Sequence, residues 1–328
     1  MNSNPKSVQP GIGFGTWSWG NKLLWGYNPQ YNDALLERAF IDSVNGGLEL
    51  VDTADSYGTG QLEGRSEILI GNFIKKLSIN QRNKLTIATK LAPFPWRLGR
   101  RGFDKAFYLS QKRLQGNIDR VQIHWSTSRY APWQEKSLLN GLGDLNEKGL
   151  IKEVGLSNFG LNNLKIINNS FKLRGLNIKS LQIQLSLLCP DLENSKYIRD
   201  FCLEENIQLI AYSPLALGVL SVSPYENKMN KQTFLRNQIY KLLLKESLDL
   251  RKAIHNIAIE RNASQAQVAI NWCREFGALP IPGIRTSAQA KDIINALNWK
   301  LNKEEFKKLN LLSEKCKRRM PKNPFSSN

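Results

Sequence analysis

The sequence contains few cysteines and no long apolar run. Its four cysteines, Cys189, Cys202, Cys273 and Cys316, lack the spacing of a metal site or a redox motif, which favours reduced thiols in a cytoplasmic protein. No apolar stretch reaches the roughly 18 residues that span a bilayer. The N-terminus, MNSNPKSVQP, lacks the apolar core of a secretory signal. We therefore expect a cytoplasmic protein with no membrane partner and no metal.

Acidic residues are also scarce. The 46 basic and 28 acidic residues give a formal net charge of +18, with basic clusters at 97–101 and 315–319. Such a surplus suits nucleic acid, an anionic membrane or a phosphorylated cofactor. Because no RNA-binding signature or zinc-finger spacing accompanies the charge, we expect no nucleic-acid partner.

Eight short β-rich segments recur along the 328 residues at intervals of roughly 30, and helical patterns fill the intervals. Most of the segments are continuous apolar runs, as in strands buried on both faces. They are 12–17, 48–53, 84–90, 120–125, 152–158, 180–186, 207–213 and 278–283. This arrangement is typical of a (β/α)8 TIM barrel. The alternative, a doubly wound open sheet, lacks a G-x-G-x-x-G turn after any early strand.

We expect one barrel domain over 1–328, with a flexible segment 1–10, a loop and helix insertion over 218–245, and a C-terminal helix and tail over 300–328. One helix is expected from an N-cap at Asn32 to the glycines at 46–47, and others over 65–77, 264–277 and 302–315.

Polar residues stand where the predicted strands end. They are Asp52 and Tyr57, Lys90, His124, Ser157 and Asn158, Gln182, and Tyr212 and Ser213. Each has an ordinary explanation by itself, as a turn residue, a helix cap or a hydrogen-bonded core residue. Asp55 and Ser56, just before Tyr57, are expected to be turn residues that shape the loop. Active sites of TIM barrels lie at these strand ends, so the coincidence predicts that the side chains meet in one pocket.

The chemistry of these residues suits the reduction of a carbonyl group. A tyrosine hydroxyl has a pKa near 10, which a nearby ammonium such as Lys90 would lower. Asp52 would hold Lys90, Tyr57 would donate a proton, and His124 would orient the carbonyl oxygen. The hydride must come from a cofactor, because no side chain donates one.

The motifs GFGTW, VDTADSYG, ATK, IHW, GLSNF, AYSPLALG and PIPGIRTSAQAKD follow one another over nearly the whole chain. In this order and spacing the chain resembles the aldo-keto reductase superfamily of NADPH-dependent carbonyl reductases, which are (β/α)8 barrels. WSWGNKLLWGYN and PWRLGRR are similar to a plastid and cyanobacterial branch of that family.

The resemblance implies a catalytic tetrad of Asp52, Tyr57, Lys90 and His124, with Tyr57 as the general acid. It also implies binding of NADPH rather than NADH, with Arg285 on the adenosine 2′-phosphate. Ser157, Asn158 and Gln182 would hold the nicotinamide carboxamide, and Tyr212 would stack on the nicotinamide ring. The implied cofactor contacts are Gly15, Thr16, Trp17, Asp52, Ser157, Asn158, Gln182, Tyr212, Ser213, Leu215, Leu217, Gly218, Ile281, Pro282, Gly283, Arg285, Thr286 and Gln289. Leu185 and Ile293 depart from the family pattern, which affects only the fine cofactor contacts.

The expected substrate is a small carbonyl compound. Trp25, Trp96 and Trp125 are candidates for the substrate pocket, with a flat or aromatic carbonyl such as pyridoxal as one possibility. The alternative is that these rings pack loops onto the barrel rim. A cofactor-binding sensor or regulatory subunit with little turnover is the alternative function, and the oligomeric state is not predicted.

Overall fold

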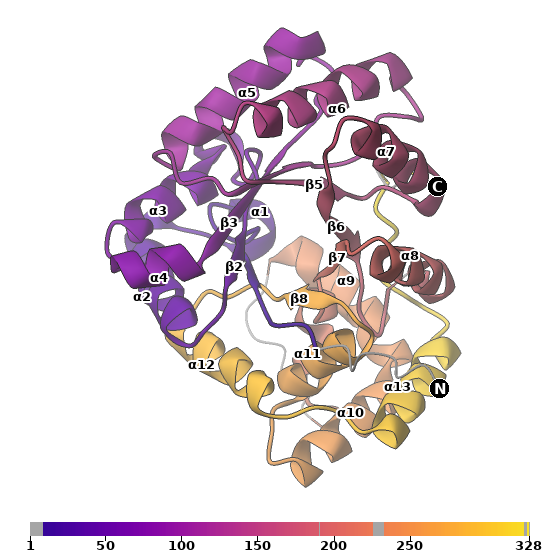
Figure 1. The fold of residues 1–328 in the computed structure, drawn as a ribbon. Helices are drawn as coiled ribbons and strands as arrows, with labels where there is room; N and C mark the ends of the chain where they lie inside the picture. The colour runs from indigo at the N-terminus through magenta and orange to yellow at the C-terminus, as the bar shows by residue number, and fades with distance from the viewer. Residues whose placement is uncertain (1–8, 190, 226–232, 325–326, 328) are drawn as a thin grey trace.

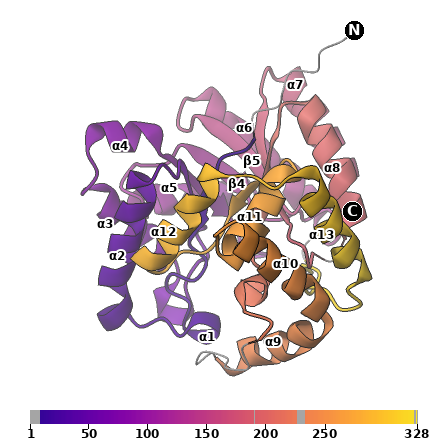
Figure 2. The same cartoon turned by 90° about the horizontal axis from the view of Figure 1, so that it is seen from below.

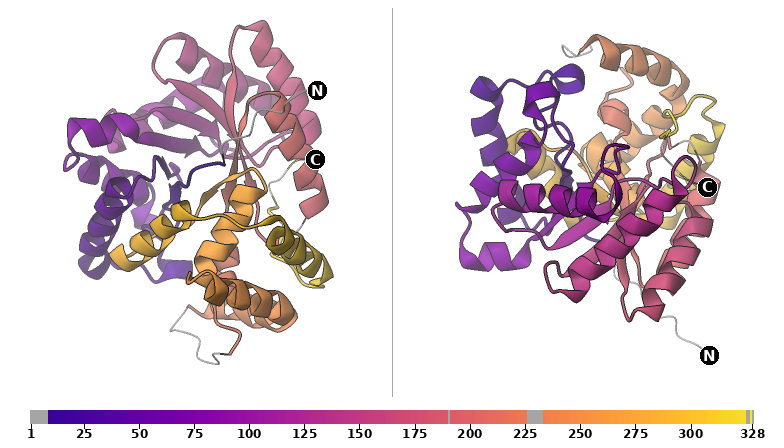
Figure 3. Two further views of the ribbon diagram at one scale, coloured as in Figure 1. Left: turned by 60° about the horizontal axis from the view of Figure 1, so that its bottom comes forward. Right: turned by 90° about the horizontal axis from the view of Figure 1, so that it is seen from above.

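Figure 1 shows the chain as a computed structural model that describes residues 9–189, 191–225, 233–324 and 327. Most of the segment expected to be flexible, residues 1–8, lies outside this range, as does the middle of the expected insertion, residues 226–232. Strands occupy the centre of the molecule and helices surround them (Figures 1 and 3).

The eight strands are parallel, and each pairs with the next along the chain. The strands are β1 (Phe14–Gly15), β2 (Leu50–Asp52), β3 (Thr86–Leu91), β4 (Arg120–Ile123), β5 (Glu153–Ser157), β6 (Ile178–Gln184), β7 (Gln208–Tyr212) and β8 (Leu279–Ile281). Backbone N–H groups of Gly13 and Gly15 donate to the carbonyls of Pro280 and Pro282 at 3.0 and 2.9 Å, which joins β1 to β8 and closes the barrel. The predicted (β/α)8 fold is confirmed, with one strand in each predicted segment.

Helices follow the strands as the sequence pattern predicted. They are α1 (Lys22–Trp25), α2 (Pro29–Asn45), α3 (Arg65–Ile74), α4 (Ile79–Lys84), α5 (Gly99–Arg113), α6 (Pro132–Glu147), α7 (Leu161–Leu173), α8 (Leu192–Glu204), α9 (Phe234–Glu246), α10 (Leu248–Glu260), α11 (Gln265–Glu275), α12 (Ser287–Asn295) and α13 (Lys303–Lys315). Three 3-10 segments, η1 (Gly60–Leu62), η2 (Ala216–Ser221) and η3 (Ala296–Asn298), complete the helical elements of the described residues.

Helix ends show how local chemistry sets the boundaries. The side chain of Ser264 accepts a hydrogen bond from the backbone N–H of Gln267, which confirms the predicted start of α11. The expected N-cap of α2 at Asn32 is wrong. Asn28 is the cap, because Pro29 has a fixed φ that suits the first helical position and so begins the helix one turn earlier.

The interior of the barrel is apolar at one end and polar at the other. Leu50, Ala88 and Ile210 belong to a small apolar cluster separate from the main core. Side chains alternate across a strand, so Asp52, Lys90 and Tyr212, each two residues further on, point to the same inner side. The strands therefore deliver polar side chains to the C-terminal end of the barrel above an apolar base.

The long connection between β7 and β8 holds η2, α9, α10 and α11. Figure 2 shows α9 beside α1, where the hydroxyl of Thr233 donates to the carbonyl of Leu24 at 3.1 Å. In Figure 3 the yellow helix α13 lies against the orange α10. Within the described residues no helix has both the length and the apolar character needed to cross a bilayer.

Candidate active site

A cavity of about 810 Å³ opens at the C-terminal end of the barrel. Most of the residues predicted to form the site line it. They are Gly15, Trp17, Trp25, Asp52, Tyr57, His124, Trp125, Ser157, Asn158, Gln182, Tyr212, Ser213, Leu215, Leu217, Gly218, Ile281, Pro282, Gly283, Arg285 and Gln289. Most of the residues predicted at the strand ends therefore lie around one cavity, as expected for a TIM barrel.

Asp52 and Lys90 form a buried ion pair at the base of this cavity. The Lys90 Nζ lies 2.5 Å from Asp52 Oδ2 and donates to the carbonyl of Thr53 at 2.9 Å. The other carboxylate oxygen, Asp52 Oδ1, accepts from the side-chain amides of Gln182 at 2.8 Å and Gln122 at 3.2 Å. Because Asp52 and Lys90 are each 1% exposed, these bonds replace the water that either charge would need.

Tyr57 stands beside this pair. Lys90 Nζ lies 4.9 Å from the centroid of the Tyr57 ring. Burial, followed by the charges of Asp52 and Asp55, raises the pKa of Tyr57 well above its usual 10. The net shift is therefore opposite to the lowering expected from Lys90, because burial of the phenol dominates it. The phenol is protonated at neutral pH, as a proton donor must be.

His124 faces Tyr57 across the cavity, with ring centroids 5.8 Å apart. Burial, together with the charges of Lys90 and Arg97, holds the pKa of His124 well below its usual 6.5. The imidazole is therefore neutral at pH 7 and carries one N–H. Such a group can donate a hydrogen bond to a carbonyl oxygen but is not a strong acid.

Asp55 does more than the turn role expected of it. Its carboxylate forms a buried ion pair with Arg97 and accepts from the backbone N–H of Ala92. Burial raises the pKa of Asp55 to about 6, although Arg97 opposes the rise. This contact ties the loop that carries Tyr57 to the loop after β3. The basic cluster at 97–101 was the only sequence signal of such a partner.

The residues expected around the nicotinamide form hydrogen bonds with one another. The Asn158 side chain donates to the carbonyl of His124 and to Ser157 Oγ, both at 3.0 Å. Tyr212 donates its hydroxyl proton to Asn158 Oδ1 at 2.8 Å. Asn158 has a φ of 62°, in the left-handed region, where Asn is one of the few side chains that is tolerated.

Two guanidinium groups flank Trp25 at the other end of the cavity. The Cζ atoms of Arg236 and Arg285 lie 4.1 and 5.1 Å from the Trp25 ring. Burial and the charge of Arg236 lower the pKa of Arg285, which shows that the two cations repel each other. Arg236 was missed from the sequence, because a lone Arg in a helix has no spacing pattern that marks it. Together the two arginines suit an anionic group.

Buried polar atoms at this end lack partners. Ser18 Oγ, Trp25 Nε1 and Arg236 Nε, on residues that line the cavity, have no hydrogen-bond partner in the described part of the chain. Unpaired buried polar atoms are costly and rare in folded proteins. Each of the three is inaccessible to solvent, so it meets a ligand in the cavity only if its side chain moves.

Four predicted site residues do not line the cavity. Thr16 is buried behind it, where its hydroxyl donates to the carbonyl of Asp52 at 2.9 Å, and Lys90 lies beneath it. Thr286 caps α12 through the backbone N–H of Gln289. Trp96 is 73% exposed and stacks on Phe94 at 4.6 Å, which matches the alternative that its ring packs a rim loop.

Residues 320–324, after α13, also line the cavity and were missed. The segment has no apolar periodicity and no family motif, so nothing in its sequence indicated that it returns to the strand ends.

A family profile described as the aldo/keto reductase family matches residues 11–314. The chain is 42% identical over 328 aligned positions to the chloroplastic pyridoxal reductase of Arabidopsis thaliana, covering 98% of this chain and 88% of that protein.

Among solved structures, the glycerol dehydrogenase of Gluconobacter oxydans is 22% identical with a TM-score of 0.75, covering 98% of this chain and 96% of that one. An aldo-keto reductase of Klebsiella pneumoniae in complex with NADPH is 21% identical with a TM-score of 0.69, covering 96% and 100%. These two likenesses show the barrel fold. The profile and the Arabidopsis relative confirm the resemblance seen in the motifs: the chain belongs to the aldo/keto reductase family and is an oxidoreductase that reduces carbonyl groups with NADH or NADPH.

Proposed function

We propose that this protein reduces an aldehyde or ketone to an alcohol with NADPH, and that Tyr57 is the general acid. The observation that carries the proposal is the juxtaposition of a protonated phenol, a neutral imidazole and the buried Lys90–Asp52 pair at the base of one cavity. His124 is neutral and is not a strong acid, so it does not replace Tyr57 as the proton donor.

The cavity fits a nicotinamide dinucleotide phosphate. Arg236 and Arg285 provide paired positive charge for phosphate groups at one end, and Ser157, Asn158 and Gln182 provide amides and a hydroxyl at the other. When bound, the cofactor supplies the hydride that no side chain can donate. Guanidinium groups favour NADPH, because they bind a dianionic phosphate in a bidentate manner.

The side chains provide the proton and the electrostatics. Tyr57 donates its proton to the carbonyl oxygen, and neutral His124 orients that oxygen through an N–H hydrogen bond. The Tyr57 phenolate left behind is stabilised by the nearby ammonium of Lys90, which Asp52 and the Thr53 carbonyl hold in place. Solvent then returns a proton to Tyr57.

The substrate is proposed to be a small flat aldehyde. Trp17 and Trp125 line the cavity and provide aromatic faces, and the Trp125 ring lies 5.0 Å from that of His124. Trp25 lies instead between Arg236 and Arg285. The Arabidopsis relative, 42% identical, is named a pyridoxal reductase. Pyridoxal is therefore the first substrate to test.

The test is the oxidation of NADPH and of NADH, followed at 340 nm, with pyridoxal and a panel of aliphatic and aromatic carbonyls. The Tyr57→Phe variant should bind NADPH with unchanged affinity but lose about two to four orders of magnitude in kcat, the usual contribution of a general acid. An unimpaired rate would remove Tyr57 from the mechanism. Bound NADPH that no carbonyl oxidises would instead favour a sensor or regulatory subunit.

A further inference from the structure

The C-terminal tail returns to the strand ends and is anchored there. The backbone N–H of Met320 donates to the carbonyl of Leu188 at 2.8 Å, and the Arg319 guanidinium donates to the carbonyls of Cys189 and Ser313. Further on, the Ser327 hydroxyl accepts from the N–H of Gly160 at 2.9 Å. These contacts fix the path of the tail by its backbone and by residues on both sides of Asn323.

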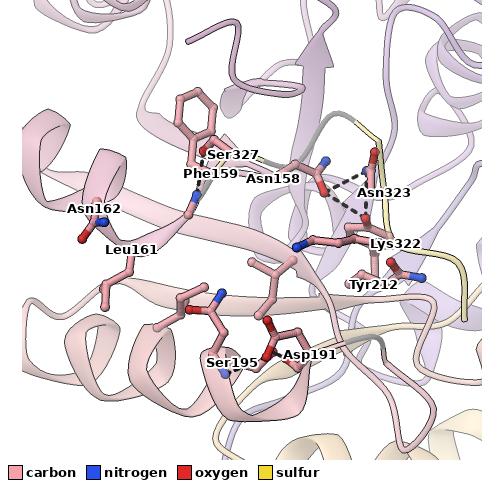
Figure 4. Close-up of a pocket in the computed structure, with 15 residues that line it drawn as sticks. Asn158, Phe159, Leu161, Asn162, Asp191, Ser195, Tyr212, Lys322, Asn323 and Ser327 are labelled. Atoms are coloured by element: carbon pink, nitrogen blue, oxygen red, sulfur yellow. Dashed lines mark hydrogen bonds between the residues drawn. The ribbon is translucent and has the colours of Figure 1, made fainter. Parts of the chain in front are cut away.

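Asn323 joins the two residues expected to contact the nicotinamide. Its side-chain amide donates to Asn158 Oδ1 and to the Tyr212 hydroxyl oxygen, both at 3.0 Å. Figure 4 shows the three side chains converging at one edge of a second cavity, of about 370 Å³. Asn158, Tyr212 and Asn323 line this cavity and the larger one alike, so they form a partition between the two.

The orientation of the Asn158 amide follows from its fixed partners. The carbonyl of His124 can only accept a hydrogen bond, so the NH2 group of Asn158 must face it. The oxygen of Asn158 then faces Tyr212 and Asn323, and each of these donates to it. With Asn323 in place, the amide oxygen accepts from two donors, and neither Asn158 nor Tyr212 is free to turn. A ligand that bonds to Asn158 exchanges with the N–H contact to Ser157 and leaves the bond from Asn323 in place.

We propose that Asn323 is a positioning residue for the cofactor, acting through Asn158 and Tyr212. It holds both side chains in one orientation before NADPH binds, so that binding does not have to order them. The inference rests on the proposed function, in which Asn158 and Tyr212 contact the nicotinamide end.

The size of the effect follows from the cost of ordering a side chain. Fixing one mobile side chain on binding costs the equivalent of about a twofold to tenfold loss of affinity. Asn323→Ala should therefore raise the Kd for NADPH about three- to tenfold. Because Arg319, Met320 and Ser327 still hold the tail, the midpoint of thermal unfolding should change by less than about 2 °C.

The experiment is a double-mutant cycle on the full chain. The Kd for NADPH is measured by fluorescence titration in the wild type, Asn323→Ala, Asn158→Ala and the double variant, with thermal unfolding of each. Lys317→Ala, an exposed change in the same tail, is the matched control and should leave the Kd unchanged. Interacting residues give non-additive effects, so Asn323→Ala should have a smaller effect once Asn158 is alanine, because only the bond from Asn323 to Tyr212 then remains to be lost.

The outcomes distinguish the positioning role of Asn323 from the cofactor contact assigned to Asn158. Weaker binding in Asn323→Ala that becomes smaller in the Asn158→Ala background supports the positioning role. The positioning role is overturned if Asn323→Ala has an equal effect in both backgrounds, leaves the affinity for NADPH unchanged, or tightens binding. This holds even when Asn158→Ala alone binds NADPH weakly. If Asn158→Ala binds NADPH as the wild type does, the contact assigned to Asn158 fails as well.

Discussion

Lys90→Met would leave a carboxylate buried without its counter-ion. The methionine side chain has a similar length, so the space stays filled while the positive charge is lost. Asp52 would keep the amide hydrogen bonds from Gln182 and Gln122, but these are neutral donors. Removing one partner of a buried pair typically destabilises a protein by about 3–5 kcal/mol. The side chains of Lys90 and Asp52 are 1% and 2% exposed, so solvent cannot offset this loss.

The loss is large enough to see as a shift in the unfolding temperature. The entropy of unfolding is about 2.1 cal/mol/K per residue, or about 0.7 kcal/mol/K for a chain of 328 residues. A destabilisation of about 3–5 kcal/mol therefore lowers Tm by about 4–7 °C. Differential scanning calorimetry and urea unfolding at pH 7 measure it.

The double variant Asp52→Asn/Lys90→Met is the control. It removes both charges and keeps an amide that can still accept from Gln182, so it should recover most of the lost stability. The reasoning is refuted if Lys90→Met unfolds at the temperature of the wild type, or if the double variant is no more stable than Lys90→Met. Either result would mean that the charge of Asp52 is not desolvated in the folded protein.

Two further predictions concern the charged groups around the site. Arg285→Met should raise the Kd for NADPH about tenfold to a hundredfold, since a hydrogen bond to a charged group contributes about 1.5–3 kcal/mol. The same change should alter the Kd for NADH less than twofold. The exposed Lys291→Met is the control, on helix α12, which begins two residues after Arg285. Equal losses for both cofactors would contradict the role given to Arg285. Asp55, whose pKa is raised from 3.8 to about 6, favours its neutral form in the folded protein, so its contribution to stability falls as pH rises from about 4 to 6. When the pH is lowered from 7 to 4, the wild type should therefore gain up to about 3 kcal/mol of unfolding free energy relative to Asp55→Asn. Urea unfolding of both proteins over this pH range measures the gain. Parallel pH profiles of the two proteins would argue against the raised pKa of Asp55.

The barrel and most of the site could be read from the sequence, because both depend on local patterns. Continuous apolar runs predict strands buried on both faces, and their regular spacing with helices predicts the parallel barrel. In such a barrel the C-terminal ends of all strands must meet. Asp52, Lys90 and His124 could therefore be placed in one pocket although up to 72 residues separate them.

Contacts that depend on where a loop or tail comes to rest could not be predicted. Asp55 looked like a turn residue until its carboxylate met Arg97, and Trp96 looked like a pocket residue until its ring stacked on Phe94. Arg236 reaches Trp25 only because α9 packs beside α1.

The pKa values of the site residues could not be predicted from the sequence either, although the groups themselves could. The sequence predicted Tyr57 as the acid and Lys90 as its neighbour, from residue type and order along the chain. Only the tertiary structure showed that burial, not Lys90, dominates the pKa of Tyr57, because desolvation depends on everything packed around a group. By itself the sequence determined the fold, the family and the identity of the chemical groups. Their burial, their partners and the return of Asn323 to Asn158 were decided by packing between segments that share no local pattern.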